Sequence, residues 1–284
     1  MTVARQARNG TPPGDPVVPP PEPLPAGALD GHCHLDLIEQ PLAEVLAAAR
    51  AAGIRRVVTV GVDVATSHWS ARCAAEHADV YAAVAVHPNE TGAAASSVQA
   101  RNAALRELRA LAALRRVRAV GETGLDYYRD CASPQVQQRW FRAHIDLAKE
   151  ARKPLMIHNR DAHEDVLRIL EEEGPPEEVV FHCFSGDAAM AKRCAEAGYV
   201  MSFAGNVTFR NAQPLREAAA AAPVDLLLPE TDAPFLTPVP HRGKPNTPAM
   251  VAHTIRFLAG LKNLPVAELC ERMTATAERL YGPW

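Results

Sequence analysis

From Ala28 onward, short β-branched or apolar runs alternate with longer segments rich in Ala, Leu, Glu and Arg. The short runs are typical of buried strands, and the longer segments have the periodicity of amphipathic helices. Strands are predicted at 29–34, 56–62, 80–86, 118–122, 154–158, 179–184, 199–204 and 226–230. Helices are predicted at 41–52, 66–76, 100–114, 135–151, 162–173, 188–197, 213–221, 248–261 and 265–280. Eight strands that alternate with helices predict an α/β fold of the (β/α)8 TIM-barrel type, although a doubly wound parallel sheet has the same alternation.

A single domain accounts for most of the chain. Its 284 residues fall in the range that one (β/α)8 barrel fills, and the barrel is expected to span residues 28–284. Residues 1–27 are expected to form a disordered, Pro-rich N-terminal tail, because the segment 11–25 contains eight prolines. Such sequences favour extended conformations and do not build a packed core.

The net charge and the cysteine content limit the classes of protein to which this chain could belong. The net charge of −3 excludes the broad basic surface with which dedicated DNA-binding domains attract a polyanion, so any nucleic acid would be held by local contacts. The six cysteines include no C-x-x-C pair, which is typical of reduced thiols in the cytoplasm. No secretory signal pattern and no apolar run of roughly 18 residues is seen. We expect a cytoplasmic protein with no membrane association and no obligate protein partner.

Five of the eight predicted strands end in polar residues that buried strands do not ordinarily contain. These ends are Asp30-Gly-His32-Cys-His34-Leu-Asp36, Gly121-Glu122-Thr-Gly-Leu-Asp126, Met156-Ile-His158-Asn-Arg160, Phe181-His182-Cys-Phe-Ser-Gly186 and Pro229-Glu-Thr-Asp232-Ala-Pro234. In a barrel of parallel strands, all these ends meet at one face. The sequence therefore predicts a cluster of imidazoles and carboxylates at the mouth of the barrel.

The first of these ends has the spacing of a metal site. Side chains two residues apart on a strand point the same way, so His32 and His34 are expected to face the barrel mouth together, with Cys33 turned away. An isolated His-x-His pair is more often an ordinary pair of histidines. The polar ends of four other strands favour the metal site here.

Six residues are predicted to hold two divalent metal ions, with zinc, magnesium and manganese as the candidates. They are His32, His34, Glu122, His158, His182 and Asp232. Six ligands shared by two ions leave open positions for water and substrate, and such a pair activates water for attack at phosphorus. Glu122, on the central fourth strand, is expected to bridge the ions. Asp232 is expected to be both ligand and general base, with a turn or cap residue as the alternative.

The sequence resembles the TatD family of metal-dependent deoxyribonucleases. The motifs that carry the resemblance are D-G-H-C-H-L-D, V-H-P, G-E-T-G-L-D-Y-Y, P-L-M-I-H-N-R-D-A, F-H-C-F-S-G and E-T-D-A-P-F-L-T-P-x-P-x-R-G-K-x-N-x-P. They occur in the order of the strands, from about Asp30 to the carboxyl terminus. Asn89 and Thr276 depart from residues common in the family, which leaves the details of the substrate open.

The resemblance implies a TIM-barrel hydrolase that cleaves phosphodiester bonds of DNA, as a 3′–5′ exodeoxyribonuclease, by metal-activated water. Carried over by motif, His32, His34, Glu122 and Asp232 would hold one ion, and Glu122, His158 and His182 would hold the other.

Further residues near the strand ends are candidates for contact with substrate. Arg160, Arg242 and Lys244 lie on predicted loops, where a cation can meet a phosphate, although solvated loop charges are an equal alternative. His87, at the end of the third strand, could position a phosphate or form a hydrogen bond within the barrel. Asp36 and Asp126 are expected to orient ligands or to cap turns. The remaining histidines are expected on the surface, namely His68, His77, His144, His163, His241 and His253.

Two other functions are compatible with parts of this pattern. An amidohydrolase-type enzyme could cleave another ester or amide, such as D-aminoacyl-tRNA or a small molecule. Many such enzymes bridge their metals with a carbamylated lysine, and the segment 118–126 contains no lysine, which favours the Glu-bridged class. A non-catalytic barrel would be expected to have lost ligands, whereas all six are present.

Overall fold

The computed structural model describes residues 18–94 and 97–283. Its strands form one parallel sheet in the order β1 to β8, so each strand pairs with the next strand along the chain. The strands are β1 (Ala28–Cys33), β2 (Ile54–Val60), β3 (Val80–Val84), β4 (Val117–Asp126), β5 (Leu155–Arg160), β6 (Val179–Phe181), β7 (Val200–Phe203) and β8 (Leu227–Pro229). A sequential order of parallel strands confirms the TIM barrel and excludes the doubly wound sheet, whose strand order reverses.

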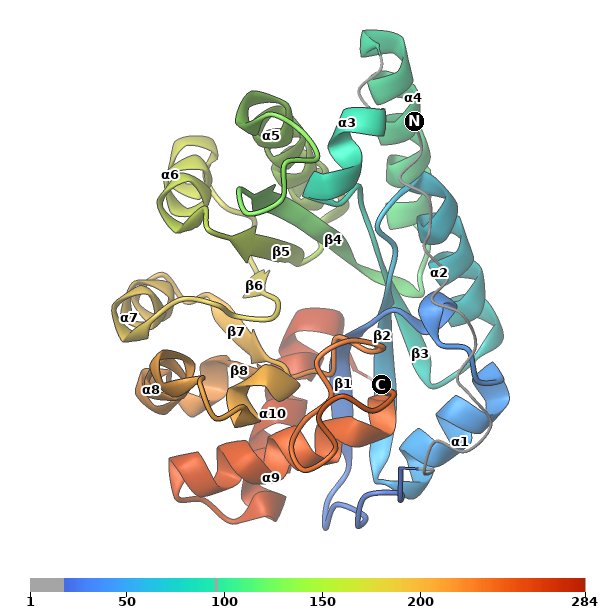
Figure 1. The fold of residues 1–284 in the computed structure, drawn as a ribbon. Helices are drawn as coiled ribbons and strands as arrows, with labels where there is room; N and C mark the ends of the chain where they lie inside the picture. Colours follow the sequence, from blue (N-terminus) through green and yellow to red (C-terminus); the bar gives the residue numbers. More distant parts are fainter. Residues whose placement is uncertain (1–17, 95–96, 284) are drawn as a thin grey trace.

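The helices form a ring around the strands (Figure 1). They are α1 (Leu42–Ala51), α2 (Val64–Glu76), α3 (Thr91–Ala94), α4 (Val98–Ala112), α5 (Pro134–Ala151), α6 (His163–Glu173), α7 (Ala188–Glu196), α8 (Gln213–Ala221), α9 (Val251–Lys262) and α10 (Val266–Tyr281). Each predicted helix is found within a few residues of its predicted ends. The short helix α3 was not predicted. No helix in the described residues is both long enough and apolar enough to cross a membrane.

The barrel closes where the segment after β8 meets β1. The amide of Asp232 donates to the carbonyl of His32 at 2.9 Å, and the amide of His34 donates to the carbonyl of Ala233 at 2.8 Å. The buried carboxylate of Asp30 accepts hydrogen bonds from the Thr231 amide at 2.8 Å and from the Thr231 hydroxyl at 2.5 Å. Polar residues at two strand ends therefore complete the barrel as well as forming its mouth.

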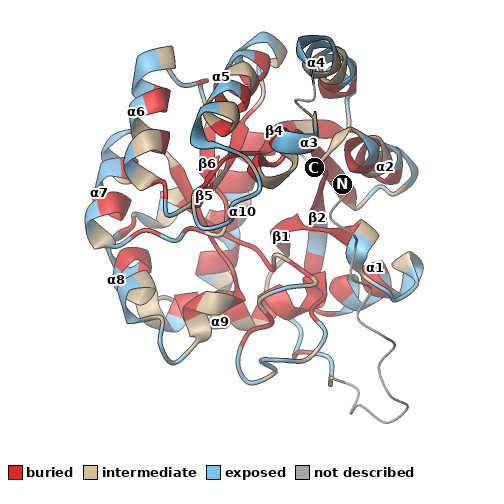
Figure 2. Ribbon diagram, turned by 45° about the horizontal axis from the view of Figure 1, so that its top comes forward, coloured by how far each residue is buried: buried red, intermediate tan, exposed pale blue. Residues whose placement is uncertain are grey.

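Apolar side chains fill both faces of the sheet, as a barrel covered by helices requires. The interior of the barrel is a separate cluster to which every strand except β3 and β4 contributes a large aliphatic residue, and β3 contributes Tyr81. The last turns of α10 add Leu280 and Tyr281 to this cluster. Figure 2 shows the strands mostly buried, apart from an exposed stretch near the start of β2, with most of the exposed surface on the outer sides of the helices and on loops. This packed core leaves the strand ends as the place for a site.

The predicted N-terminal tail is only partly described, since residues 1–17 lie outside the described part. Residues 18–27 were assigned to the tail but contact the barrel. Leu24 is buried, and its amide donates to the carbonyl of Ala52 at 3.0 Å. Arg256 donates to the carbonyl of Glu22 at 2.8 Å. One buried leucine and satisfied peptide groups hold this stretch, despite the high proline content on which the prediction rested.

Candidate metal centre

The residues predicted as metal ligands converge at the carboxyl ends of the strands. His32 lies in β1 and His34 directly follows it, Glu122 lies in β4 and His158 in β5. The other two are His182, which follows β6, and Asp232, which follows β8. His32, His34, Glu122 and His182 are buried, whereas His158 and Asp232 are partly exposed. The structure thus brings together all six residues from distant parts of the chain.

One half of the cluster consists of His32, His34 and Asp232. The Nε2 atoms of the two histidines are 3.3 Å apart. Oδ1 of Asp232 lies 3.5 Å from Nε2 of His34 and 3.8 Å from Nε2 of His32. These atoms lie close enough to share one metal ion. The predicted geometry of His32 and His34 is found, and Cys33 faces the other way and contacts the carbonyl of Val58.

Glu122 connects this half to a second one. Its Oε1 lies 3.5 Å from Nε2 of His34 and 3.8 Å from Nε2 of His32. Its Oε2 lies 2.9 Å from Nε2 of His182 and 3.3 Å from Nδ1 of His158. Each carboxylate oxygen therefore faces a different set of imidazoles. This is the arrangement expected of a carboxylate that bridges two ions.

The donor atoms fit divalent cations. Imidazole nitrogen and carboxylate oxygen are the ligands of zinc and related ions. Oε2 of Glu122 is buried and has no hydrogen-bond partner among the described residues, although Nε2 of His182 is 2.9 Å away. A buried carboxylate oxygen without a hydrogen bond is costly unless a cation compensates it. The cluster could therefore hold metal ions between these atoms.

His87 also reaches the cluster, and it was predicted to position substrate. Its Nε2 lies 3.8 Å from Oε2 of Glu122, and with Glu122 and His158 it forms a third group that could hold a metal. Its Nδ1, however, accepts a hydrogen bond from the amide of Asn89 at 3.0 Å. Burial lowers the pKa of His87 to about 3, so the ring is neutral. A neutral ring that accepts at Nδ1 carries its proton on Nε2, which favours donation to a substrate over metal ligation.

Carboxylates behind the ligands orient two of the imidazoles. Nδ1 of His182 donates to Oε1 of Glu230 at 3.1 Å, and Oε1 also accepts from the Cys183 amide at 2.8 Å. Nε2 of His158 lies 3.2 Å from Oδ2 of Asp126. Such contacts fix the tautomer, so that the other ring nitrogen faces the metal. Asp126 has both of the roles predicted for it, because its Oδ1 also caps a turn by accepting from the amides of Tyr128 and Arg129. Asp36 lies in the 3₁₀ helix Leu35–Leu37 after His34.

Glu230 and Asp30 are functional candidates that the sequence analysis did not single out. Both are fully buried carboxylates, each two residues before a predicted ligand. The sequence did contain a signal for them, because each of these two strand ends carries an acidic residue in addition to the predicted metal ligands. Their partners, His182 and Thr231, could not be identified from the sequence because they lie 48 and 201 residues away along the chain.

A glycine lets β4 approach β5 closely enough to form the cluster. Gly124 has φ of +138°, and a Cβ atom at this position would lie 2.1 Å from the carbonyl oxygen of His158. No side chain fits there, which explains the second glycine of the G-E-T-G motif. Asp232 adopts a left-handed backbone with φ of +52°, a conformation that costs free energy in a non-glycine residue and clusters at functional sites.

The three cations predicted to contact substrate are not all on loops, because β5 extends as far as Arg160. The guanidinium of Arg160 lies 3.9 Å from the centre of the Tyr128 ring, and that of Arg242 lies 4.2 Å from the centre of the Phe209 ring. Lys244 is on the loop after β8, where its carbonyl accepts from Thr237 at 2.6 Å. Their contact with substrate stays a prediction.

One histidine assigned to the surface is instead fully buried. Nε2 of His144 accepts from the amide of Val86 at 3.1 Å, and Nδ1 donates to the carbonyl of Trp140 at 2.8 Å. Burial lowers the pKa of His144 to about 4. The prediction was wrong because His144 lies on the inward face of α5, where it accepts from a backbone amide in the segment after β3.

Several pKa values in the cluster are shifted. Burial lowers the pKa of His34, but the contact with Asp232 and the charge of Glu122 outweigh it and raise the pKa from 6.5 to about 9. The pKa of His182 is also raised, because the charges of Glu122 and Glu230 outweigh the effect of burial. The histidines in turn outweigh the burial of Glu122 and hold its pKa well below the usual range. Without a metal, the cluster therefore retains protons on imidazoles.

Metal binding should release these protons. A ligand imidazole must be neutral, so an ion has to displace the protons held by His34 and His182. At pH 7 we expect about one to two protons released per protein, and tighter binding as the pH rises toward 9. Calorimetric titration with Zn²⁺ in two buffers of different ionisation enthalpy measures the number released. Equal heats in both buffers would contradict the shifted pKa values.

Glu230 can be tested by an isosteric substitution. Glu230→Gln keeps the shape but weakens the acceptor for His182, so metal affinity should fall about 10- to 100-fold. Competition with a chromogenic chelator measures that affinity. Glu171→Gln, at an exposed position of α6, is the matched control and should bind metal normally. If both variants bind metal like the unaltered protein, Glu230 does not orient His182.

A (β/α)8 barrel with buried imidazoles and carboxylates at the carboxyl ends of its strands has the architecture of metal-dependent hydrolases. The chain belongs to the TatD family, since a family model described as TatD related DNase matches residues 29–282. The predicted family is thus confirmed, and the protein is a TatD-family metal-dependent hydrolase.

Individual relatives agree with this assignment. The uncharacterized metal-dependent hydrolase TatD of Mycobacterium tuberculosis is 47% identical over 263 residues, covering 89% of this chain and 97% of the relative. The metal-dependent hydrolase YcfH of Escherichia coli K12 is 39% identical over 259 residues, covering 89% of this chain and 95% of the relative. The crystal structure of YjjV, a TatD homolog from Escherichia coli, superposes with a TM-score of 0.82 at 27% identity, covering 90% of this chain and 98% of YjjV.

Proposed function

We propose that this protein is a two-metal deoxyribonuclease that removes nucleotides from the 3′ end of DNA. The observation that carries the proposal is the position of Glu122, whose two carboxylate oxygens face different sets of imidazoles. Further support comes from the family description, TatD related DNase. The first ion would be held by His32, His34, Glu122 and Asp232, and the second by Glu122, His158 and His182.

The side chains would divide the work of hydrolysis. A bound pair of divalent ions supplies Lewis acidity at the phosphate and lowers the pKa of a water molecule. Oδ1 of Asp232, which faces His32 and His34, would hold the first ion, and the other oxygen of the same carboxylate would accept the proton of the attacking water. His87 donates from Nε2 to a phosphate oxygen, because its ring is neutral and its Nδ1 already accepts from Asn89.

Substrate recognition would rest on local cations. The net charge of −3 provides no long-range attraction for DNA. Arg160 is the last residue of β5, and Arg242 and Lys244 follow β8, so all three belong to the face that carries the cluster. In this proposal they contact phosphates next to the one being cleaved. No stable protein partner is needed.

A cytoplasmic setting is part of the proposal. All six cysteines are free thiols, and four of them are buried. Reduced thiols are the normal state in the cytoplasm and are uncommon in exported proteins.

The test is release of nucleotides from 3′-labelled and 5′-labelled single-stranded DNA. Protein stripped with a chelator should be inactive, and Mg²⁺, Mn²⁺ or Zn²⁺ added back separately should restore stepwise shortening. Immediate loss of the 3′ label with a gradual ladder from the 5′ label would establish the polarity. Protein that binds metal but leaves DNA intact with every ion would refute the nuclease proposal. Assays with D-aminoacyl-tRNA and small esters would then identify the other hydrolase class.

A further inference from the structure

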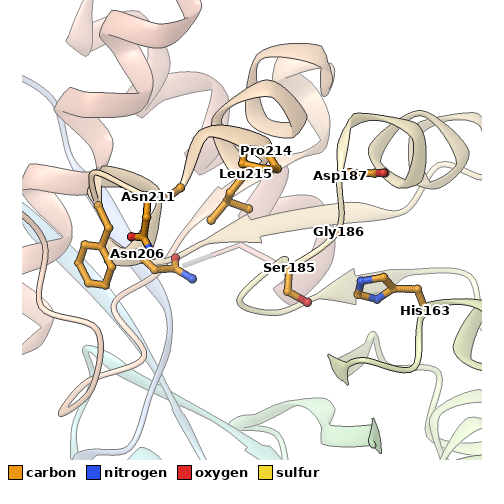
Figure 3. A pocket seen from close by; sticks show the side chains of 10 residues that line it. His163, Ser185, Gly186, Asp187, Asn206, Asn211, Pro214 and Leu215 are labelled. Atoms are coloured by element: carbon orange, nitrogen blue, oxygen red, sulfur yellow. The ribbon is translucent and has the colours of Figure 1, made fainter. Parts of the chain in front are cut away.

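A pocket lies beside the metal-ligand cluster, between the loops that follow β5, β6 and β7. Its volume is about 460 Å³, which is in the range of small-molecule sites. Figure 3 shows His163 and Ser185 on one side and Asn206, Asn211 and Leu215 on the other, with their side chains around a common space. None of these residues is among the predicted metal ligands.

The loop after β6 joins the pocket to the cluster. Ser185 is three residues after His182, and successive Cα atoms are about 3.8 Å apart, so their Cα atoms lie within about 11 Å of each other. Asn206 also contacts this loop, because its Nδ2 donates to Sγ of Cys183 at 3.8 Å. A substrate group in the pocket could therefore be covalently attached to a phosphate at the cluster.

The walls of the pocket suit a neutral, flat group that forms hydrogen bonds. Phe209, Leu215 and Pro214 provide apolar surface. Apart from His163, the one ionisable lining residue is Asp187, and its carboxylate is already used to cap α7 by accepting from the Met190 amide at 2.9 Å. Without a cation of lysine or arginine type in its lining, the pocket does not fit a phosphate.

One lining residue has a polar atom without a partner. Oδ1 of Asn206 is buried and accepts no hydrogen bond among the described residues. A buried amide oxygen of this kind costs free energy unless a donor from elsewhere reaches it. The exposed amide of Asn211 lies in the same wall. Asparagine amides match the donor and acceptor edges of nucleobases.

We propose that this pocket binds the base of the nucleotide whose phosphate is at the metal cluster. The inference rests on the proposed nuclease function and adds a subsite for the base. The side-chain amide of Asn206 turns so that Oδ1 faces the pocket and accepts a hydrogen bond from a ring or exocyclic N–H of the base, and the base packs against the apolar wall. The phosphate stays outside the pocket, where the metal ligands and Arg242 are available.

The first experiment measures binding without catalysis. Metal-loaded protein is titrated with deoxyadenosine and with 2-deoxyribose, and binding is followed by saturation-transfer NMR. Deoxyadenosine should bind and 2-deoxyribose should not. Asn206→Leu should weaken binding about tenfold, the effect of one lost hydrogen bond. Asn211→Ala, at an exposed position that folding does not require, should also weaken it, whereas Asn102→Ala on the exposed side of α4 should not.

The second experiment separates this proposal from the nuclease proposal. DNA ending in a 3′ abasic residue should be degraded with a KM about tenfold higher than DNA with an ordinary end, and Asn206→Leu should reduce this difference. Equal KM values for both ends, or deoxyadenosine binding that neither variant alters, would overturn the base subsite while leaving the nuclease intact. Absence of DNA cleavage together with Asn206-dependent nucleoside binding would refute the nuclease and retain the pocket as a nucleoside site.

Discussion

Glu122→Gln should abolish hydrolysis and lower the metal content of both halves of the cluster. The substitution removes the negative charge from the carboxylate whose oxygens face His34 on one side and His182 on the other. If the transition state loses several kcal/mol of metal-dependent stabilisation, kcat falls about 10³-fold or more. Metal analysis of the dialysed protein and the rate of DNA hydrolysis are the measurements.

Two comparisons make this result specific. His158→Gln removes a ligand of one ion only, so it should leave more activity and more metal than Glu122→Gln. Glu171→Gln, on the exposed surface of α6, should behave like the unaltered protein. Near-normal turnover or full metal content in Glu122→Gln would contradict the bridging role.

Asp232→Asn should lower kcat by about 10² to 10⁴-fold, the usual contribution of a general base. Asparagine retains an oxygen that can face His32 and His34 but cannot accept the proton of the attacking water. The variant should therefore show a larger fall in kcat than in metal content. Kinetics and metal analysis on the same sample measure the two effects separately. Asp146→Asn, at an exposed position of α5, is the control. An unaltered kcat would exclude Asp232 as the general base and leave it only a structural role in the turn after β8.

The sequence was sufficient to predict the number, order and type of the strands, because each strand reads as a short apolar run. It was also sufficient to predict that six imidazole and carboxylate side chains meet at one site, because buried strand ends do not ordinarily carry such residues. The end of β4 was less predictable. The strand continues four residues past Glu122 to Asp126, because Gly124 lets it stay paired with β5 as far as Arg160.

Other features depend on contacts that local sequence does not encode. The helical pattern predicts His144 on the surface, but the side chain is buried because it accepts a hydrogen bond from the amide of Val86. Leu24 lies in a Pro-rich stretch, and its burial depends on the turn after α1. The role of Glu230 depends on a histidine 48 residues away. In each case tertiary packing overrides the local pattern.

The contacts between β1 and the segment after β8 have a consequence for the dynamics of the protein. The peptide groups of His32, His34 and Asp232 form hydrogen bonds there, while their side chains form one half of the metal-ligand cluster. Any local opening that separates the first strand from the last must also separate these ligands. An ion bound to the folded state therefore opposes that opening by linkage. Amide hydrogen exchange at His34 and Asp232 is therefore expected to slow when a metal ion binds, because the ion would hold the first strand to the segment that follows the last one.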